Sequence, residues 1–305
     1  MRFKEDVLLY RDKEKTIIKK GIYKYIIEDK DGDIYKVLIK NKFDKETTPK
    51  EQFEFLESNN LICDNYKNVF ENTKNEKNIS FFECYFNNIS PLDVQKIIQE
   101  KNVAIIGMGG IGTVVLDSLQ RMGFKNFVII DYDNVEISNL NRQILFNEYS
   151  IGQPKTLIAK NNTFKNINIV CINKKIDSYE KINSNIIKKT DFIINCADTP
   201  NNIIEIINDF AVKESIPFIT GHVGIETGTW GPIYDHRLKN FKKTPVIDVP
   251  MKLIKGSISA TNAIIGNFIA LDTMVYLSEE KRGNNTLLYK EKILNFKTLE
   301  IEVVE

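Results

Sequence analysis

Several features that mark whole classes of protein are missing from this sequence. Its 305 residues carry 42 Lys and Arg against 41 Asp and Glu, a formal net charge of +1, so bulk charge predicts no nucleic-acid partner. No apolar run reaches the roughly 18 residues that cross a membrane, and the charged start of the chain lacks the apolar core of a secretory signal. We therefore expect a cytoplasmic protein with neither a membrane nor a nucleic-acid partner.

Cysteine and arginine are also scarce. The four cysteines form no Cys-x-x-Cys pair, so the sequence predicts no structural zinc; they are Cys63, Cys84, Cys171 and Cys196. Only six of the 42 basic residues are arginine. An arginine inside a motif is therefore more informative here than a lysine.

The first part of the chain reads as a small mixed domain. Short runs rich in β-branched and aromatic residues predict strands over 7–10, 16–18, 23–27 and 34–39. A polar run, Asp29 to Asp33, predicts a hairpin turn before the last strand, and Thr48-Pro49 predicts the start of a helix. We expect residues 1–75 to form a winged-helix-like α+β domain and residues 76–100 to form a linker and a helix.

From Lys101 the pattern changes to strands that alternate with helices, which is typical of a parallel α/β sheet. A helix is predicted over 111–122, between the first two of the strands expected over 103–106, 127–130, 167–170, 191–194 and 216–219. We therefore expect residues 101–305 to form a Rossmann-like domain with a mostly parallel sheet. An apolar helix over 259–277 is expected to lie in its core or in a dimer interface.

The first motif that carries chemistry is a glycine-rich turn. Gly107, Gly109, Gly110 and Gly112 directly follow a predicted strand and open a predicted helix. Glycines let the backbone approach a phosphate chain, whose charge a helix N-terminus favours. The motif predicts nucleotide binding, and a merely structural turn is the alternative.

Two acids follow the next predicted strand. Asp131 lies 19 residues after Gly112, where a dinucleotide-binding fold places the acid that holds the ribose hydroxyls. Asp133 either assists it or caps the following turn. A nicotinamide dehydrogenase would fit these two motifs equally well.

The third motif favours a triphosphate over a nicotinamide. Asn139, Arg142 and Gln143 are followed by Lys155, which comes directly after a proline and starts the next predicted helix. On a helical turn Asn139 and Arg142 share one face, and cationic groups beside an amide suit phosphates. A solvated polar loop is the alternative.

The fourth motif is Asp198, which follows an apolar strand and either binds Mg²⁺ beside phosphates or caps the next helix.

Together, in this order, the four motifs resemble the ThiF/MoeB/HesA family of ubiquitin-activating-enzyme-like adenylyltransferases, over roughly residues 100–305. The resemblance implies that a carboxylate attacks the α-phosphorus of ATP, releasing pyrophosphate and giving an acyl-adenylate. It implies that Asp131 holds the ribose, that Asn139, Arg142 and Lys155 hold the phosphates, and that Asp198 binds Mg²⁺. A homodimer is also expected from it.

Within this family the chain is most similar to the microcin C type of peptide-adenylating enzyme. The segments 145–148, 221–223 and 230–234 carry that likeness, together with a small domain before the adenylating one. The resemblance implies that the N-terminal domain captures the leader of a ribosomally made precursor peptide by adding it as an extra strand. The chain departs from the family in lacking the Cys-x-x-Cys pairs and any arginine between Arg11 and Arg121.

The substrate stays open at this point. The leading hypothesis is activation of a peptide carboxylate, at the C-terminus or on a side chain, during maturation of a peptide natural product such as a bacteriocin. One alternative is activation of a ubiquitin-like sulfur-carrier protein, and another is a catalytically silent scaffold that binds a leader peptide. A further residue, His222, follows a predicted strand near the expected crevice and is either structural or in contact with substrate.

Overall fold

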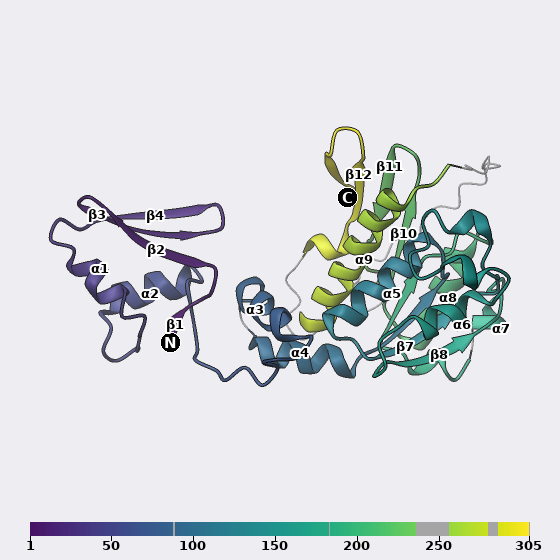
Figure 1. Cartoon of the computed structure of the whole chain (residues 1–305), viewed down its shortest axis with the longest axis horizontal. Coiled ribbons are helices and arrows are strands. Elements are labelled where there is room, and N and C mark those ends of the chain that lie inside the picture. The colour runs from purple at the N-terminus through teal and green to yellow at the C-terminus, as the bar shows by residue number, and fades with distance from the viewer. Residues whose placement is uncertain (88, 183, 236–255, 280–285, 305) are drawn as a thin grey trace. The chain divides into compact units, whose positions relative to one another are not determined.

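A computed structural model of the chain describes residues 1–87, 89–182, 184–235, 256–279 and 286–304. The chain forms two compact units, Met1–Lys96 and Ile97–Glu305 (Figure 1). Residues 76–87 and 89–96, which lie in the stretch expected to form a linker and a helix, group with the first unit and contain helix Glu76–Tyr85 and the start of helix Pro91–Glu100.

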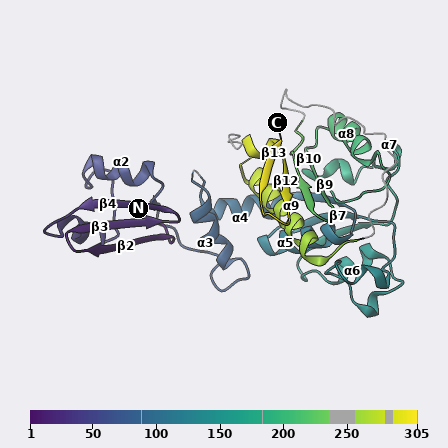
Figure 2. The ribbon, with the colours of Figure 1, turned by 90° about the horizontal axis from the view of Figure 1, so that it is seen from above.

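The first unit is built on a three-stranded antiparallel sheet in the order β2-β3-β4. Its strands are β2 (Val7–Asp12), β3 (Lys15–Lys20) and β4 (Tyr23–Glu28), and a second, short pair joins β1 (Arg2–Phe3) to β5 (Ile62–Cys63). Helices α1 (Asp33–Leu38) and α2 (Lys50–Ser58) lie on one face of the sheet (Figures 1 and 2). Their apolar residues, among them Leu38 and Leu56, pack with Ile18 into a separate core.

The predicted strand over 34–39 is wrong, since these residues form helix α1. The cause lies in the preceding turn. The buried carboxylate of Asp29 accepts the backbone N–H groups of Ile34 and Tyr35 at 3.1 and 3.0 Å, and Gly32 adopts φ 73° just before the helix. Local capping therefore overrides the β-propensity of this apolar run.

Helix α3 (Glu76–Tyr85) is fastened to the start of the chain. Both terminal nitrogens of the Arg2 guanidinium donate to the carboxylate of Glu83, at 3.0 and 2.6 Å, and the side chain of Glu83 is 1% exposed. The backbone N–H of Glu5 donates to the same carboxylate. These bonds lower the pKa of Glu83 although its burial acts in the opposite direction. The helix α4 (Pro91–Glu100) follows, within the stretch 76–100 where a helix is expected.

The second unit contains a mostly parallel sheet, as the sequence predicts. In its described part an 8-stranded sheet runs in the order β13-β12-β11-β10-β9-β6-β7-β8. The parallel strands are β6 (Asn102–Ile106), β7 (Asn126–Ile130), β8 (Asn168–Ile172), β9 (Phe192–Asn195) and β10 (Phe218–Val223). The antiparallel strands are β11 (Thr227–Trp230), β12 (Glu291–Asn295) and β13 (Ile301–Val304).

Helices cover both faces of this sheet. On one face, Ile193 of β9 lies in a core with Ile207 and Phe210 of α8 (Ile203–Glu214). On the other, the ring of Phe192 lies 5.3 Å from that of Tyr276 in α9 (Ser259–Glu279). Strands buried on both faces are typical of parallel sheets and explain their unbroken apolar sequences. Three further helices are α5 (Gly110–Met122), α6 (Lys155–Asn161) and α7 (Tyr179–Ile182).

Helix α9 is the one described helix that is long and apolar enough, by length and composition, to cross a membrane. In the second unit 56% of that apolar stretch is buried. It packs on α5, where Gly266 lies so close to Val114 that a Cβ would come within 2.8 Å of Val114 Cγ1. This placement is that of a core helix, one of the two positions that the sequence predicts for it.

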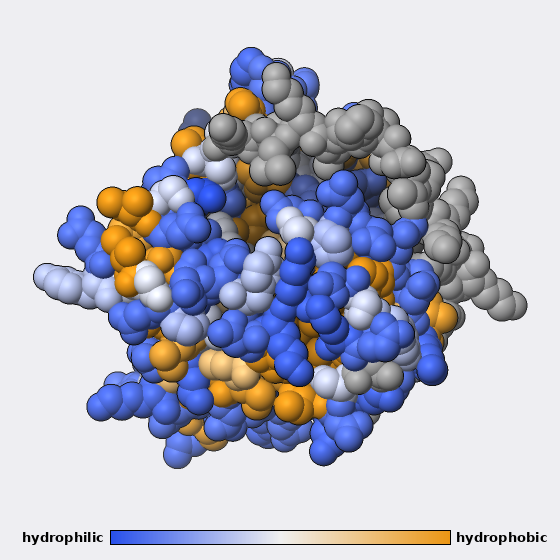
Figure 3. Space-filling model, turned by 90° about the vertical axis from the view of Figure 1, so that its right-hand side faces the viewer, coloured by the Kyte–Doolittle hydropathy of each residue, from blue (hydrophilic) through white to orange (hydrophobic). Residues whose placement is uncertain are grey.

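The side of the second unit seen in Figure 3 is mainly hydrophilic, with apolar side chains in separate groups. Exposed apolar residues of the helices in this unit include Leu157 of α6 and Val212 of α8. Isolated residues of this kind are common on protein surfaces and indicate no docking area by themselves.

Candidate functional site

The site predicted from the motifs lies where the strand order of the sheet reverses. From β6 the chain continues to β7 on one side, whereas β9 lies on the other side of β6 and leads on to β10. Ile106, the last residue of β6, pairs with Asn195, the last residue of β9. In open parallel sheets, ligands bind outside the carboxyl ends of the strands at such a switch point. The glycine turn and Asp198 both follow directly from these two strand ends.

The four glycines of the turn differ in the space that a side chain would find at each position. Gly107 has φ +91°, and a Cβ there would lie 2.8 Å from the backbone nitrogen of Ala197. Cβ atoms at Gly110 and Gly112 would collide with the Asn262 side chain and the Gly107 carbonyl oxygen. At Gly109, by contrast, a Cβ would meet no protein atom within 4 Å. The open space beside Gly109, at the N-terminus of α5, leaves room for a ligand's phosphate chain.

Asp131 joins the end of β7 to the glycine turn. Its carboxylate accepts the backbone N–H of Met108 at 2.6 Å and that of Asp133 at 2.8 Å. Burial raises the pKa of Asp131, while the charge of Lys155 and these two hydrogen bonds act against that rise. The carboxylate is therefore oriented by the backbone, at the position where the sequence predicts the ribose-binding acid.

Lys155 and Asp133 lie side by side at the two ends of the segment 134–154, which we call the excursion. The ammonium of Lys155 lies 3.0 Å from the Asp133 carboxylate, and the Lys155 backbone N–H donates to the Asp133 carbonyl oxygen. Lys155 is 6% exposed although it is a lysine. Residues 134–154 thus form a closed excursion that begins and ends beside Asp131.

Three predicted residues of this excursion lie in its first turns. The side chain of Asn139 accepts the backbone N–H of Glu136, and Arg142 donates to the Ser138 carbonyl oxygen and the Asn141 side chain. In the described residues these bonds stay within the 136–142 segment and do not tie Asn139 or Arg142 to Asp131. The Oε1 atom of Gln143 is buried without a hydrogen-bond partner in the described structure.

Asp198 is exposed beyond the end of β9, where it accepts the Thr199 hydroxyl at 3.2 Å. The next helix, α8, starts at Ile203 with Asn202 before it, so Asp198 does not cap it. Burial raises the pKa of Tyr132, and the charges of Asp133, Asp131 and Asp198 raise it further. Asp198 and the acids after β7 thus follow strand ends at the same edge of the sheet. Their charges act on Tyr132, a residue that the sequence reasoning missed although it lies between two of those acids.

The donor set fits a nucleotide better than a metal alone. The glycine turn, an α5 N-terminus with no side-chain cap and the unpartnered Gln143 oxygen offer groups that a nucleotide requires. No cluster of three or more His, Cys, Asp or Glu residues that could hold a metal is found in the described part of the chain. Because Mg²⁺ is commonly held by one or two carboxylates plus phosphates, Asp198 fits a metal that is shared with a bound triphosphate.

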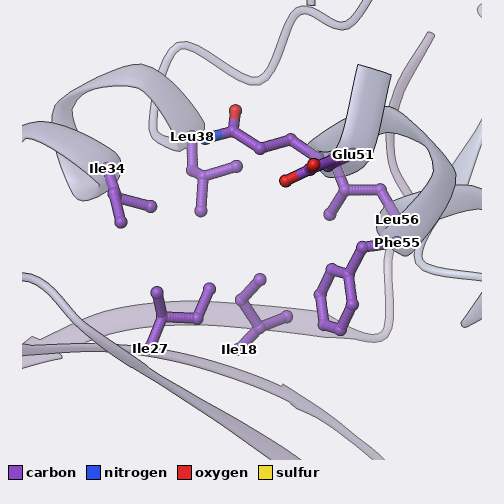
Figure 4. A pocket seen from close by; sticks show the side chains of 8 residues that line it. Ile18, Ile27, Ile34, Leu38, Glu51, Phe55 and Leu56 are labelled. Atoms are coloured by element: carbon purple, nitrogen blue, oxygen red, sulfur yellow. The ribbon is translucent and has the colours of Figure 1, made fainter. Parts of the chain in front are cut away.

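The first unit contains a second candidate site of a different kind, which the sequence reasoning missed. A cavity of about 250 Å³ lies between the sheet and its two helices and is lined by Ile18, Ile27, Ile34, Leu38, Glu51, Gln52, Phe55 and Leu56. Figure 4 shows Ile34 and Leu38 of α1 facing Ile18 and Ile27 of the sheet across the open space. Its lining is thus aliphatic and aromatic apart from Glu51 and Gln52, which suits an apolar side chain of a partner.

Comparison with known proteins matches residues 84–304 to the ThiF family. Among characterised relatives, the SUMO-activating enzyme subunit 2 of Dictyostelium discoideum is 36% identical over 137 residues, which is 44% of this chain and 20% of that protein. The sulfur carrier protein adenylyltransferase of Thermus thermophilus is 25% identical over 227 residues, 68% of this chain and 81% of that protein. The chain thus spans about a fifth of the first relative but most of the second.

Similar folds are found among solved structures. That of E. coli MccB with ATP has a TM-score of 0.80 at 21% identity and covers 100% of this chain and 96% of that one. A structure of E. coli MccB with MccA-N7isoASN has a TM-score of 0.81, also at 21% identity, with 100% and 96% coverage. The likeness extends over both units of the chain and confirms the predicted fold class.

Proposed function

The chain belongs to the ThiF family, and on that basis we propose that it is an ATP-dependent adenylyltransferase that activates a carboxylate of a ribosomally made precursor peptide. The observation that carries the proposal is the meeting of the glycine turn, Asp131, Lys155 and Asp198 at the carboxyl ends of β6, β7 and β9. Such an edge suits a nucleotide, and its mixed charge suits ATP better than a neutral ligand.

In this proposal each group has one role. The ribose hydroxyls bind Asp131, whose orientation is already set by two backbone N–H groups. The phosphates lie along Gly107, Gly109, Gly110 and Gly112. Side chains of Asn139, Arg142 and Lys155 complete the phosphate site, with Asp133 holding Lys155 in place. Gln143, whose buried Oε1 atom is an acceptor, binds a donor group of the nucleotide. Negative charge develops on the phosphates during the reaction. It is stabilised by the cations of Arg142 and Lys155 and by the Mg²⁺ that Asp198 would hold.

The chemistry requires no nucleophile from the protein. One oxygen of the substrate carboxylate attacks the α-phosphorus, the bond to the bridging oxygen breaks and pyrophosphate leaves with that electron pair. Such transfers depend mainly on positioning and on charge neutralisation. Asp198 is the residue that would hold Mg²⁺, and the ion would supply part of that neutralisation.

Two observations support a peptide as the substrate. The solved neighbours include MccB with MccA-N7isoASN, and the whole chain, including the first unit, shares that fold. The first unit also has an apolar cavity beside the exposed strand β4, so a leader peptide can add to the sheet edge and insert one apolar side chain. Residues 1–75 would act as this peptide clamp and residues 101–305 as the adenylation domain. We place the enzyme, as a homodimer in the cytoplasm, in the maturation of a peptide natural product such as an antibiotic.

One alternative substrate has specific support. The curated relatives include a sulfur carrier protein adenylyltransferase that matches 68% of this chain. A small ubiquitin-like protein with a flexible C-terminus would present its carboxylate to the same crevice. This candidate does not account for the apolar cavity in the first unit.

The proposal is tested by exchange of labelled pyrophosphate into ATP, which occurs only when an acyl-adenylate forms reversibly. The chain is assayed with a pool of synthetic peptides, each also made with a C-terminal amide, and separately with a sulfur-carrier protein. We expect exchange with the peptides. Exchange that survives amidation identifies a side-chain carboxylate, and exchange that is lost upon amidation identifies the C-terminal carboxylate. Exchange with the carrier protein alone would contradict the peptide assignment.

A further inference from the structure

The crevice contains a histidine to which the proposed reaction has so far assigned no role. His222 lies near the carboxyl end of β10, two residues after the Thr220–Asn195 pair that joins β10 to β9. Asp198 follows the neighbouring strand β9, so both residues lie at the carboxyl edge of the sheet, and the charge of Asp198 acts to raise the pKa of His222. His222 therefore borders the crevice on the side away from the glycine turn and Asp131.

A chain of hydrogen bonds orients this ring. The Asn195 amide is fixed by Ala197, whose N–H donates to Oδ1 at 3.2 Å and whose carbonyl oxygen accepts from Nδ2 at 3.3 Å. The same Nδ2 donates to the Thr220 hydroxyl oxygen at 3.1 Å. The two bonds to Ala197 fix the orientation of the amide, because exchanging its O and N atoms would lose both, and the Asn195 side chain is therefore a donor toward Thr220.

The next contact in the chain joins Thr220 to the ring of His222. Thr220 is buried, and its hydroxyl lies 3.3 Å from Nε2 of His222. Because the hydroxyl already accepts from Asn195, its own proton needs an acceptor, and Nε2 is the acceptor that the described residues offer. With Nε2 as that acceptor the ring proton lies on Nδ1, which is the tautomer that the contact inferred below requires.

The surroundings of the ring also favour its neutral form. Burial lowers the pKa of His222, and the charge of Asp198 opposes that shift only in part. In the described structure Nδ1 has no hydrogen-bond partner. The fold thus leaves one neutral, oriented N–H donor at the edge of the crevice.

We propose that the Nδ1–H of His222 binds the reacting carboxylate of the substrate, by donating to the oxygen that does not attack phosphorus. This inference rests on the proposed adenylation. In that step one C–O–P bond forms, one P–O bond breaks and no proton is transferred, so the site needs neither an acid nor a base. A neutral donor orients the carboxylate while leaving the negative charge that makes it a nucleophile. An arginine or lysine at this position would pair with that charge and weaken the attack.

The tautomer is tested directly by NMR. The chain contains 2 histidines, so His236→Gln, which changes a residue outside the described part, leaves His222 as the only one. Long-range ¹H–¹⁵N spectra of this variant at pH 7.5 should show the proton on Nδ1. The Thr220→Val change, which removes the hydroxyl donor at nearly equal volume, should abolish that preference. A proton on Nε2, or the same tautomer in both proteins, would overturn the hydrogen-bond chain.

Binding tests the contact with substrate. The probe is an alanyl-sulfamoyl adenosine, in which an acyl group is joined to the nucleoside, and AMP serves as the matched ligand without it. We expect His222→Phe to weaken binding of the acyl probe about tenfold while changing AMP affinity less than twofold. His222→Asn, which keeps an N–H donor near the Nδ1 position, should recover most of the loss.

The outcomes separate this inference from the function on which it rests. If the wild-type chain binds neither AMP nor the acyl probe, the adenylation proposal fails and this inference fails with it. If both ligands bind but His222→Phe affects them equally, adenylation stands and the role of His222 is overturned. Equal loss in the Phe and Asn variants would likewise overturn it, because a merely structural ring does not depend on an N–H donor.

Discussion

Lys155 and Asp133 are joined twice, once through their side chains at 3.0 Å and once through their backbones at 3.0 Å. The double contact joins the two ends of the excursion 134–154 and holds the buried ammonium of Lys155 near Asp131. A lysine is usually a flexible point charge, and here the backbone itself sets where that charge lies. The finding makes Lys155 the most firmly placed cation of the proposed phosphate site.

The glycine turn allows binding and folding to be separated. Gly112→Ala should lower the free energy of unfolding by about 2–3 kcal/mol, because its Cβ collides with the Gly107 carbonyl oxygen inside the turn. Gly109→Ala meets no protein atom and should leave that free energy nearly unchanged while weakening ATP binding. Urea unfolding and ATP titration of both variants check this. Equal ATP affinity in Gly109→Ala and wild type would show that the open space is not the phosphate site.

Asp198 should matter for the reaction and not for the fold, since it is exposed and its one hydrogen bond in the described structure is to its neighbour Thr199. We expect Asp198→Asn to lower kcat for pyrophosphate exchange at least about 100-fold, or about 2.7 kcal/mol. The melting temperature should stay the same. Asp209→Asn, an exposed acid on α8, is the control and should keep full activity. Normal turnover in Asp198→Asn would remove its assignment to Mg²⁺.

The cavity of the first unit predicts a selective effect on the peptide. Ile34→Phe should fill part of the 250 Å³ space and raise the KM for peptide about tenfold, with the KM for ATP unchanged. Ile26→Phe is the matched control, because Ile26 is exposed and neighbouring residues of a strand point to opposite faces of the sheet. A parallel rise in both KM values, or equal effects of the two variants, would argue against the peptide clamp.

The antiparallel part of the second unit holds a buried ion pair. Lys292 lies 2.7 Å from Asp272 of α9, which also accepts the indole N–H of Trp230 at 3.1 Å. Burial raises the pKa of Asp272, and removing the Lys292 ammonium would leave this carboxylate without its ionic partner. Lys292→Met should therefore lower the free energy of unfolding by about 3 kcal/mol. The exposed pair Lys297–Glu226 is the comparison, and Lys297→Met should cost less than about 1 kcal/mol. Urea unfolding measures the loss of unfolding free energy in both variants. Equal losses would contradict the conclusion that the buried pair stabilises the fold more than the exposed pair does.

The sequence predicts those features of this molecule that depend on local pattern. The unbroken apolar runs predict the parallel strands because such strands are buried on both faces, and the spacing of glycines predicts the turn after β6. The run 34–39 shows the limit of this approach. Its composition favours a strand, and the deciding Asp29 cap forms only after the chain has turned.

The relations between distant residues lie beyond a single sequence. Nothing in the spacing of Asp133 and Lys155 indicates that they share two hydrogen bonds, and the tautomer of His222 depends on Asn195 and Thr220 in two strands. The cavity of the first unit likewise results from the packing of α1 and α2 on the sheet. Each is a product of tertiary packing, which local propensity does not encode.

The central claim is that this chain binds ATP through the edge that holds Lys155. The most direct test is a calorimetric titration of Mg-ATP into the wild-type chain, Lys155→Met and Lys160→Met, the last changing an exposed lysine on the same helix. The account predicts binding in the micromolar range for wild type and Lys160→Met, and at least about tenfold weaker binding for Lys155→Met. Absence of binding to the wild type, or equal affinity in all three proteins, would contradict it.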